Sequence, residues 1–372
     1  MHSLVKNSCF GCGVCAVICS HKAISIQLNK KGFYTPFVNN KMCVNCNLCI
    51  HICPLNNKIV EHDVVSSGYA SWSIDDIVRY ITSSGGTTFE IIKHVIQKGY
   101  KIIGARYNNT KKRVEHFVAD NIQEAHETIG SKYLQSYTVD AFSQINSSDK
   151  YLIIGTPCQI AAIRLFLKKK NIEDKSILID FFCHGVPSMF LWNKYLSENK
   201  VLQDKSLTIS WRDKSFGWHN SWNITAKNSN QYFYYSKTNK KDLFFKFFLG
   251  HLCLCDSCYT DCKYKSDKSC ADIRVGDFWD TTFDDNDQGV NCVLALSTKG
   301  KNILNETKEL YLKSYENHIV TRGQMCKNAR PSYVESLVIF LLKTIIPLKT
   351  IYFVAKLLSK ILKLVKEKKS DT

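Results

Sequence analysis

The fold is decided by the stretch Cys9-Phe-Gly-Cys12-Gly-Val-Cys15-Ala-Val-Ile-Cys19 and by its repeat, Cys43-Val-Asn-Cys46-Asn-Leu-Cys49-Ile-His-Ile-Cys53-Pro54. Both copies have the spacing C-x2-C-x2-C-x3-C, and they start about 34 residues apart. Between them, alternating apolar and polar residues predict a strand at 23–28, and residues 30–36 predict a turn and a second short strand. The repeat therefore frames a small unit at the start of the chain.

This spacing is typical of iron–sulfur ligation. An iron–sulfur cube needs four soft thiolates that converge from a small volume. In such a run the first three cysteines bind one cluster, and the fourth binds the cluster of the other copy. We therefore expect two 4Fe-4S clusters, one held by Cys9, Cys12, Cys15 and Cys53, and the other by Cys43, Cys46, Cys49 and Cys19.

Structural zinc is the alternative for these cysteines. Zinc sites usually take two C-x2-C pairs, whereas this chain repeats a run of four. Over residues 1–57 the unit resembles a bacterial two-cluster ferredoxin, although Ser20 stands where proline usually follows the fourth cysteine. We expect a ferredoxin-like domain at 1–60 that conducts electrons.

Composition narrows the functional class. The chain has 372 residues, 17 cysteines and a formal charge of +17, with 45% hydrophobic and 22% charged residues, as in globular proteins. Met1–Lys6 carries no apolar core of an export signal, so we expect a cytoplasmic, reducing location with thiolates held for metal. Lysine greatly outnumbers arginine, which is unlike proteins that read DNA sequence, and we expect no nucleic-acid partner.

From Gly68 onward the pattern changes to alternating strands and helices. We expect an α+β protein overall, in which the ferredoxin-like domain is followed by an α/β region. Helices are predicted at 87–98, 157–168 and 301–313. Strands are predicted at 68–72, 101–105, 151–155, 177–182, 206–211, 221–226 and 273–277.

Several short motifs occur in a characteristic order. They are Ser84-Gly85-Gly86, Gly130–Tyr133, Gly155–Ala161, Phe182–Pro187, Arg212–Trp218 and Asp272–Trp279. Together they resemble the family of coenzyme F420 hydrogenase/dehydrogenase beta subunits, over residues 66–330. The resemblance implies an FAD-binding oxidoreductase with its own iron–sulfur cluster beside the flavin. It implies a flavin-binding N-terminal part at 66–148 and a C-terminal part with a third iron–sulfur site at 149–330.

The cofactor-binding residues expected from this resemblance start at the glycine-rich turn. Small residues before a helix let the backbone approach a phosphate, although most glycine pairs are simply turns. The expected set is Ser84, Gly85, Gly86, Thr87, Lys132 and Arg212, where the two cations would pair with FAD phosphates unless they are solvated surface charges. His184 is expected as a catalytic proton donor near the flavin, with loop shaping as its alternative role.

A third cluster is expected on cysteines far apart in the sequence. Cys158 and Cys183 each follow a predicted strand, and Cys258 and Cys262 lie in a cysteine-dense loop. We expect these four to be its ligands. Cys253, Cys255 and Cys270 are the other candidates, and a buried thiol in the core is the alternative for any one of them.

The last segment, 331–372, is predicted to form a basic amphipathic helix. Its apolar residues Ile351, Val354, Ala355, Leu358, Ile361, Leu362 and Val365 recur at helical spacing, and Lys349, Lys356, Lys360, Lys363 and Lys366 fall elsewhere on the wheel. Packing on the protein's own core is one role, and peripheral membrane contact is the other. No uncharged stretch is long enough to span a membrane.

The sequence thus predicts an iron–sulfur flavoprotein oxidoreductase. Single electrons would pass through 4Fe-4S clusters to or from FAD, and two electrons to or from a small-molecule substrate or reduced coenzyme. A ferredoxin or another redox subunit would be the electron partner. The alternative is a non-catalytic electron-relay subunit of a larger redox complex.

Overall fold

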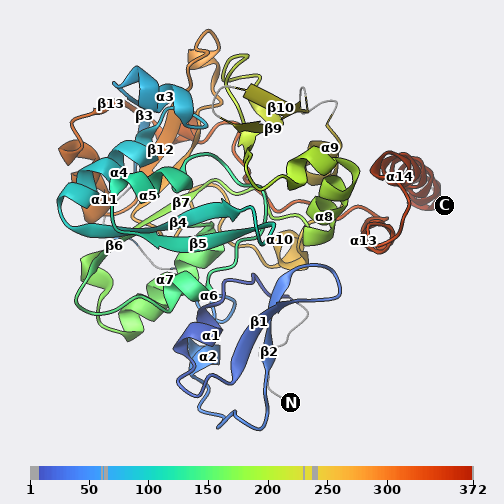
Figure 1. Cartoon of the computed structure of the whole chain (residues 1–372), viewed down its shortest axis with the longest axis horizontal. Coiled ribbons are helices and arrows are strands. Elements are labelled where there is room, and N and C mark those ends of the chain that lie inside the picture. The colour runs from blue at the N-terminus through green and yellow to red at the C-terminus, as the bar shows by residue number, and fades with distance from the viewer. Residues whose placement is uncertain (1–7, 60–61, 63–65, 229–230, 237–241, 371–372) are drawn as a thin grey trace.

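The computed structural model describes residues 8–59, 62, 66–228, 231–236 and 242–370, with side chains up to residue 363 in the last helix. The N-terminal segment used for the export-signal prediction, and the side chains of Val365 and Lys366, lie outside this description. The chain forms a large α/β body from which a small N-terminal unit projects, at the bottom of Figure 1. The last two helices pack beside the body, at the right of that view.

The N-terminal unit consists of a hairpin and two short helices. Each helix lies within one copy of the cysteine motif: α1 is Val14–Ile18 and α2 is Leu48–His51. The hairpin pairs β1 (Ile24–Leu28) with β2 (Tyr34–Val38) in antiparallel register, which confirms both predicted strands. Gly13 opens α1 with φ of +77°, a conformation that only glycine adopts without strain.

An eight-stranded sheet forms the centre of the body, with the order β13-β3-β12-β11-β7-β6-β4-β5. Its four parallel strands are β4 (Tyr100–Asn108), β6 (Lys150–Ile154), β7 (Ser176–Phe181) and β11 (Ile273–Asp277). The antiparallel strands are β3 (Ser67–Ser73), β5 (Arg113–Ala119), β12 (Asn291–Ala295) and β13 (Leu310–Tyr315). Strands on both sides of residue 148 share this sheet, and the domain division expected there stays a prediction.

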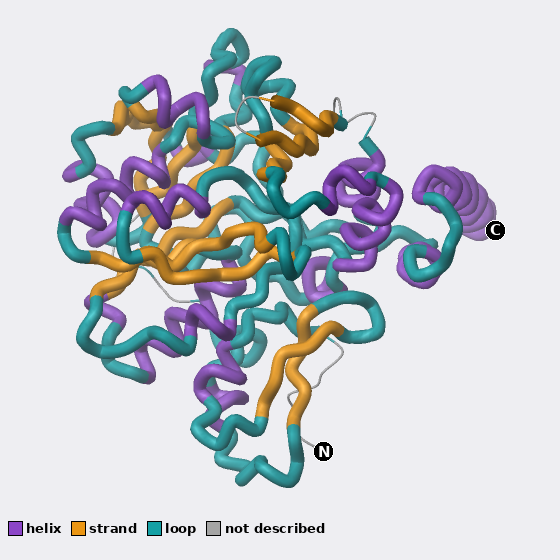
Figure 2. Tube along the Cα trace, viewed as in Figure 1, coloured by secondary structure: helices purple, strands orange, loops and turns teal. Residues whose placement is uncertain are grey.

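Helices cover both faces of this sheet, as Figure 2 shows. Ile177 and Ile179 of β7 lie in one core cluster with residues of α4 (Thr87–Gln97) and α11 (Thr298–Glu306). Leu178, between them, lies in the opposite cluster with α7 (Pro157–Lys169) and the N-terminal helices α1 and α2. Because side chains alternate along a strand, one sequence run supplies both layers. The N-terminal unit is thereby part of the core.

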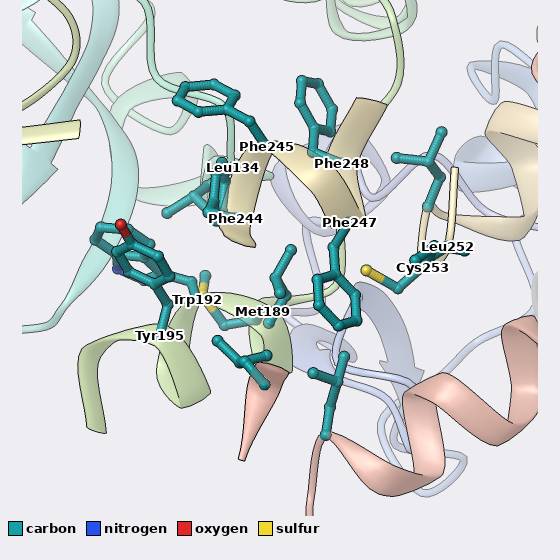
Figure 3. Packing of buried hydrophobic residues seen from close by; sticks show 14 of the residues in the cluster. Leu134, Met189, Trp192, Tyr195, Phe244, Phe245, Phe247, Phe248, Leu252 and Cys253 are labelled. Carbon is teal, nitrogen blue, oxygen red and sulfur yellow. The ribbon is translucent and has the colours of Figure 1, made fainter. Parts of the chain in front are cut away.

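A second core lies beside the sheet and is rich in aromatic residues. It includes the three-stranded sheet of β8 (Thr208–Arg212), β9 (Trp222–Asn228) and β10 (Gln231–Tyr235). Helices α8 (Met189–Glu198) and α9 (Leu243–Leu249) pack against each other there. Figure 3 shows the four phenylalanines of α9, all of them buried, beside Trp192 and Tyr195 of α8.

The C-terminal segment contains α13 (Glu335–Leu341) and α14 (Leu348–Ser370). Leu348, Ile351 and Ala355 are buried in the aromatic-rich core. A second apolar stripe of α14 faces outward, because Phe353 is 67% exposed and Leu357 is 49% exposed. Among the described residues no helix is both long enough and apolar enough to cross a membrane. The predicted helix is confirmed, and it packs on the core with one of two apolar stripes.

Most predicted elements are present, and one is wrong in part. All seven predicted strands and the helices at 87–98 and 157–168 are confirmed. The helix predicted at 301–313 ends at Glu306, and Leu310–Tyr315 form strand β13 instead. This strand pairs with β3, and Tyr311 stacks on Trp72 with ring centroids 4.1 Å apart. Pairing with β3, which is distant in the sequence, thus outweighs the local helical pattern of residues 310–313.

Candidate metal centres and cofactor cavity

The four cysteines predicted for the first cluster lie together at the junction with the body. Each of the thiols of Cys9, Cys12 and Cys15 interacts electrostatically with that of Cys53. Burial raises the pKa of Cys9 to about 11 and raises that of Cys12 further. Such thiols stay protonated unless a cation compensates them, and iron is such a cation. We call these four residues the proximal set.

The body holds the proximal loop through its backbone carbonyls. The Gln135 amide donates to the Phe10 carbonyl at 3.0 Å, and the Thr138 hydroxyl donates to the Cys12 carbonyl at 2.8 Å. The Ser257 hydroxyl donates to the Cys9 carbonyl at 3.0 Å. These bonds come from two separate parts of the body, the segment 135–138 and the helix that contains Ser257, so they fix the position of the proximal set relative to it.

The four cysteines predicted for the second cluster line one small hollow at the other end of the hairpin. They are Cys19, Cys43, Cys46 and Cys49. Cys46 is exposed, and Cys49 is buried. We call them the distal set. In both sets the structure brings three cysteines of one copy together with the fourth cysteine of the other copy, as the spacing predicts.

A third group of cysteines joins the proximal set to the body. Cys158 lies in the first turn of α7, Cys183 follows β7, Cys258 lies in α10 (Asp256–Thr260), and Cys262 follows α10. The Cys158 thiol interacts with Cys183, with Cys262 and also with Cys12 of the proximal set. The Cys258 thiol interacts with Cys183 and Cys158. Burial raises the pKa of Cys158 and Cys183, whereas the pKa of Cys258 is raised by its hydrogen bond with Cys255 and then by burial.

The geometry separates the remaining cysteine candidates. Cys255 lies beside Cys258 and also donates to the Cys9 carbonyl at 3.5 Å. Cys270 is packed in a small cluster with Cys158 and Cys262. Cys253 is also buried in the aromatic-rich core, but its thiol interacts with Glu335 and not with the cysteine sets. Cys255 and Cys270 therefore stay alternatives for ligation at this third set, and Cys253 is a core residue.

The described part of the chain holds no group of three or more His, Cys, Asp or Glu side chains arranged for a single metal ion. A zinc ion would need its ligands at about 2.3 Å from one point. In a cubane each thiolate binds a different iron, so the sulfurs are spaced more widely. Each set of the repeat unites three cysteines of one copy with the fourth of the other, which is the grouping that two-cluster domains use.

A cavity of about 530 Å³ opens at the carboxyl ends of the parallel strands. Residues at or just after the ends of β6, β7 and β11 line it, including Gly155, Cys183, His184 and Gly276. Aromatic rings of Tyr133, Trp222 and Phe248 form part of its wall. In open parallel sheets this edge is the usual place for a ligand, and the cavity volume suits a cofactor.

Three of the four predicted residues of the glycine-rich turn lie on the cavity wall. Ser84, Gly86 and Thr87 line it, whereas Gly85 is not among the lining residues. A Cβ atom on Gly85 would come within 2.6 Å of the Ser71 carbonyl, so this glycine serves close packing against β3. Gly86 begins α4 with φ of +89°.

The carbonyls of this turn are held by cations that follow β8. Lys214 donates to the Ser84 carbonyl at 2.6 Å and also to the carbonyls of Arg79 and Gln288. Arg212 donates to the Ser83 carbonyl at 3.3 Å. Sequence reasoning missed Lys214, although it lies in the Arg212–Trp218 motif. Its role depends on carbonyls that are distant in the sequence.

Both cations predicted for phosphate lie at the cavity with their donors engaged. The Lys132 ammonium donates to the carbonyls of Glu127, Thr128 and Ile129 at 2.8–3.0 Å. Arg212 forms an ion pair of 2.9 Å with Asp277, and its guanidinium lies 4.7 Å from the centre of the Trp222 ring. Although burial opposes the charge, Asp277 raises the pKa of Arg212. Pairing with a phosphate would require either cation to share or exchange these partners.

His184 lines the cavity between two other rings. Its ring lies 4.9 Å from Phe248 and 4.7 Å from His251, centre to centre. Its Nε2 atom is buried and has no hydrogen-bond partner among the described residues. Burial, aided by His251 and Lys265, lowers the pKa of His184 to about 4. Burial therefore disfavours the imidazolium in this arrangement, and the role of His184 as a proton donor stays a prediction.

Two family comparisons agree with this architecture. Residues 8–57 match the model of a 4Fe-4S dicluster domain. Residues 148–317 match the model that describes the carboxy-terminal part of the beta subunit of coenzyme F420 hydrogenase/dehydrogenase. The chain thus joins a segment similar to a 4Fe-4S dicluster domain to an α/β body that is similar, over residues 148–317, to that subunit. The predicted resemblance to the family of coenzyme F420 hydrogenase/dehydrogenase beta subunits is confirmed.

Individual relatives are more distant. The chain is 25% identical over 183 residues to the F subunit of the F420H2 dehydrogenase of Methanosarcina mazei, a match of 46% of this chain and 51% of that protein. The chain therefore spans about half the length of this relative. It is 27% identical over 66 residues to an uncharacterized protein of Porphyra purpurea, covering 17% of this chain and 85% of that one. A chain of the F420-reducing [NiFe] hydrogenase complex of Methanosarcina barkeri aligns with TM-score 0.49 and 16% identity, over 86% of this chain and 95% of that chain.

Proposed function

We propose that this protein is an iron–sulfur flavoprotein oxidoreductase with FAD in the 530 Å³ cavity. One observation carries the proposal: the third cysteine set lies between the proximal set and the cavity and contacts both. Cys158 interacts with Cys12 of the proximal set, and Cys183 lines the cavity. Electrons could therefore pass from the distal set to the proximal set, then to the third set and to the cavity, or in the reverse direction.

Each cysteine set would hold one 4Fe-4S cluster. The distal and proximal sets would use the eight cysteines of the repeat. The third set would use Cys158, Cys183, Cys258 and Cys262. The Lys265 ammonium donates to the Cys183 carbonyl at 2.6 Å and would fix the loop that carries this ligand. A positive charge so near would also favour the reduced, more negative state of a cluster.

Several observations support FAD as the cavity ligand. Glycines at the strand ends leave room, since a Cβ atom on Gly276 would come within 2.7 Å of the Phe182 ring. Aromatic walls and a few polar groups are typical of cofactor sites. Ser84, Gly86 and Thr87 would lie along the cofactor, and Lys214 would hold their turn in place. When bound, FAD supplies the exchange between single electrons and pairs of electrons.

His184 would act on the substrate side of the cavity. As a neutral imidazole it can donate or accept a hydrogen bond without carrying charge into an apolar wall. The substrate would be a small organic molecule or a reduced coenzyme. Coenzyme F420 is the first to test, because it occurs in the names of the matching family and of the Methanosarcina mazei relative.

The test is anaerobic purification followed by iron, sulfide and flavin assays. We expect about twelve iron atoms and about one FAD per chain, as three cubanes and one cavity require. Reduced F420 and NADH are then offered as donors, and bleaching of flavin and cluster absorbance is recorded. A chain with full iron content and no flavin would overturn the proposal that the protein is a flavoprotein. The alternative, a non-catalytic electron-relay subunit, would then remain, and it is favoured by the fact that Lys132 and Arg212 already donate to protein groups.

We also propose a cytoplasmic location with peripheral contact to an anionic membrane. All seventeen cysteines are free thiols, which suits a reducing compartment. The outward stripe of α14 contains Phe353, Leu357 and Ile361, and exposed Lys356 and Lys360 lie on the same helix. An apolar stripe with flanking lysines is typical of helices that lie on lipid. Sedimentation with phosphatidylserine vesicles, and release by salt, would test it.

A further inference from the structure

The distal set lies at the end of the N-terminal unit that faces away from the body. The other end of the hairpin contacts the body, since Phe33 is buried in the aromatic-rich core and Gly32 packs against Ser188. The opposite end of the hairpin, where β1 begins and β2 ends, therefore lies away from the body, at the bottom of Figure 1. The loop that follows Val38 carries the exposed Cys46.

The charge of this unit is unusual in that it is entirely positive. Residues 1–60 contain six lysines and no aspartate or glutamate. Two oxidised clusters, each of charge about −2 with its thiolates, would still leave an excess of about +2. Lys22 and Lys41 are both exposed near the distal set, and neither forms an ion pair within the described residues.

Apolar side chains complete the same surface. Met42 is 45% exposed and Val44 is 56% exposed, and Val44 also lines the hollow of the distal set. An apolar centre with a charged rim is the usual composition of a transient protein interface. We call the surface formed by Lys22, Lys41, Met42, Val44 and Cys46 the distal-cluster face.

We propose that the distal-cluster face docks an acidic single-electron carrier protein. The inference rests on the proposed function, because it requires a cluster at the distal set. Charge complementarity selects the partner, since a unit that has lysines and no carboxylates attracts an acidic surface and repels a basic one. The position of the two sets also favours this face. The loop of the proximal set is bonded to the body by Gln135, Thr138 and Ser257, whereas the distal set includes the exposed Cys46.

The test uses the full chain with its clusters and a purified acidic two-cluster ferredoxin as the probe. Stopped-flow absorbance gives the second-order rate constant for reduction by the reduced probe at about 50 mM and about 500 mM NaCl. We expect this rate constant to fall about tenfold with salt for the natural chain. For Lys22→Glu/Lys41→Glu we expect a rate constant about tenfold lower at low salt and nearly independent of salt.

Matched variants separate docking from general charge effects. Lys301→Glu/Lys308→Glu makes the same change of charge at exposed lysines of the body, and we expect the natural rate constant. The milder Lys22→Gln/Lys41→Gln variant should give an intermediate rate, which keeps the test valid if the double reversal does not fold. An unchanged rate for both distal variants would overturn the docking face.

A small reductant distinguishes failure of this inference from failure of the proposed function. Reduced methyl viologen needs no docked protein surface, so it should reduce the clusters of every variant at similar rates. Normal reduction by viologen with an unaltered ferredoxin rate would refute only the docking face. A chain without iron and sulfide would refute the proposed function and the docking face together.

Discussion

The two copies of the cysteine motif share their spacing and differ in their surroundings. Carbonyls of the first copy accept hydrogen bonds from Gln135, Thr138 and Ser257 of the body. The loop before the second copy is held by local bonds, such as those from the amides of Met42 and Cys43 to the Asn39 carbonyl at 3.1 Å. The same motif thus forms an enclosed centre at the proximal set and a surface centre at the distal set. The difference arises from packing against the body and not from the spacing of the cysteines.

The largest expected effect comes from removing the enclosed centre of this comparison, the proximal cluster. Cys12→Ala should remove the proximal cluster, about four iron atoms per chain. It should slow reduction of the cavity flavin by about 100-fold or more, since even loss of an outer-shell partner of a metal ligand costs about 10- to 100-fold. Flavin should stay bound, because Cys12 does not line the cavity. Iron analysis and stopped-flow flavin absorbance provide the measurements.

Cys46→Ala is the matched variant in the distal set. It should lose as much iron as Cys12→Ala and yet keep the route from the proximal set to the cavity, so small reductants should still reduce the flavin quickly. Cys326→Ala is the control, because Cys326 is exposed and outside all three sets. Equal flavin reduction in Cys12→Ala and Cys46→Ala would contradict the order of centres proposed above.

The next effect extends the comparison to the third set. Cys258→Ala should lose about four iron atoms per chain, because its thiol lies with Cys158 and Cys183. Cys253→Ala should keep all its iron, because the buried thiol of Cys253 interacts with Glu335 and not with the cysteine sets. Iron analysis of both variants, together with Cys255→Ala, identifies the ligand. Full iron content in Cys258→Ala with loss in Cys255→Ala would reassign the position.

Local sequence patterns predict what depends on local contacts. The spacing of Cys9–Cys19 and Cys43–Cys53 predicts which thiols meet, because three of four ligands lie within one loop. A short apolar run predicts the buried strand β7, whose adjacent residues Leu178 and Ile179 enter opposite cores. The third set required the family resemblance, because its members run from Cys158 to Cys262.

Long-range contacts explain where prediction fails. Strand β13 forms because β3, more than 200 residues earlier, offers an edge to pair with. Arg212, whose pairing with a phosphate stays a prediction, forms an ion pair with Asp277 of another strand that the sequence did not indicate. Lys214 holds the glycine-rich turn by donating to the Ser84 carbonyl, and no sequence spacing indicates that these two residues meet. Nothing in a local pattern predicts the partner of a buried cation.

A smaller effect tests why the proximal loop is held more firmly than the distal one. Gln135 is buried, donates to the Phe10 carbonyl and accepts from the Tyr34 amide at 2.7 Å. Gln135→Ala leaves both groups unpaired, and we expect a loss of about 2 kcal/mol in unfolding free energy. Hydrogen exchange of the N-terminal unit should accelerate around Phe10. Gln144→Ala is the control, since Gln144 is exposed and bonds only locally.

The smallest effect concerns pH and contrasts the body with the carboxylate-free N-terminal unit. Although burial opposes its charge, Asn108, Arg113 and Lys111 together lower the pKa of Glu115 below its ordinary 4.5. Below that ordinary value the unfolded chain binds more protons at this site than the folded chain, so stability falls as the solution is acidified. The contribution is complete above pH of about 4.5 and is lost as pH falls through the lowered pKa.

Glu115→Gln should therefore cost about 1 kcal/mol at pH 7, as expected for a partly screened ion-pair network, and progressively less below about pH 4.5. Denaturant unfolding at a series of pH values measures the difference, and absorbance near 400 nm records cluster loss in the same samples. Cluster loss should follow the same pH curve in both proteins, because residues 8–59 contain no carboxylate. A difference in unfolding free energy that grows on acidification would contradict this assignment, since it would mean that Glu115 is stabilised in its protonated form.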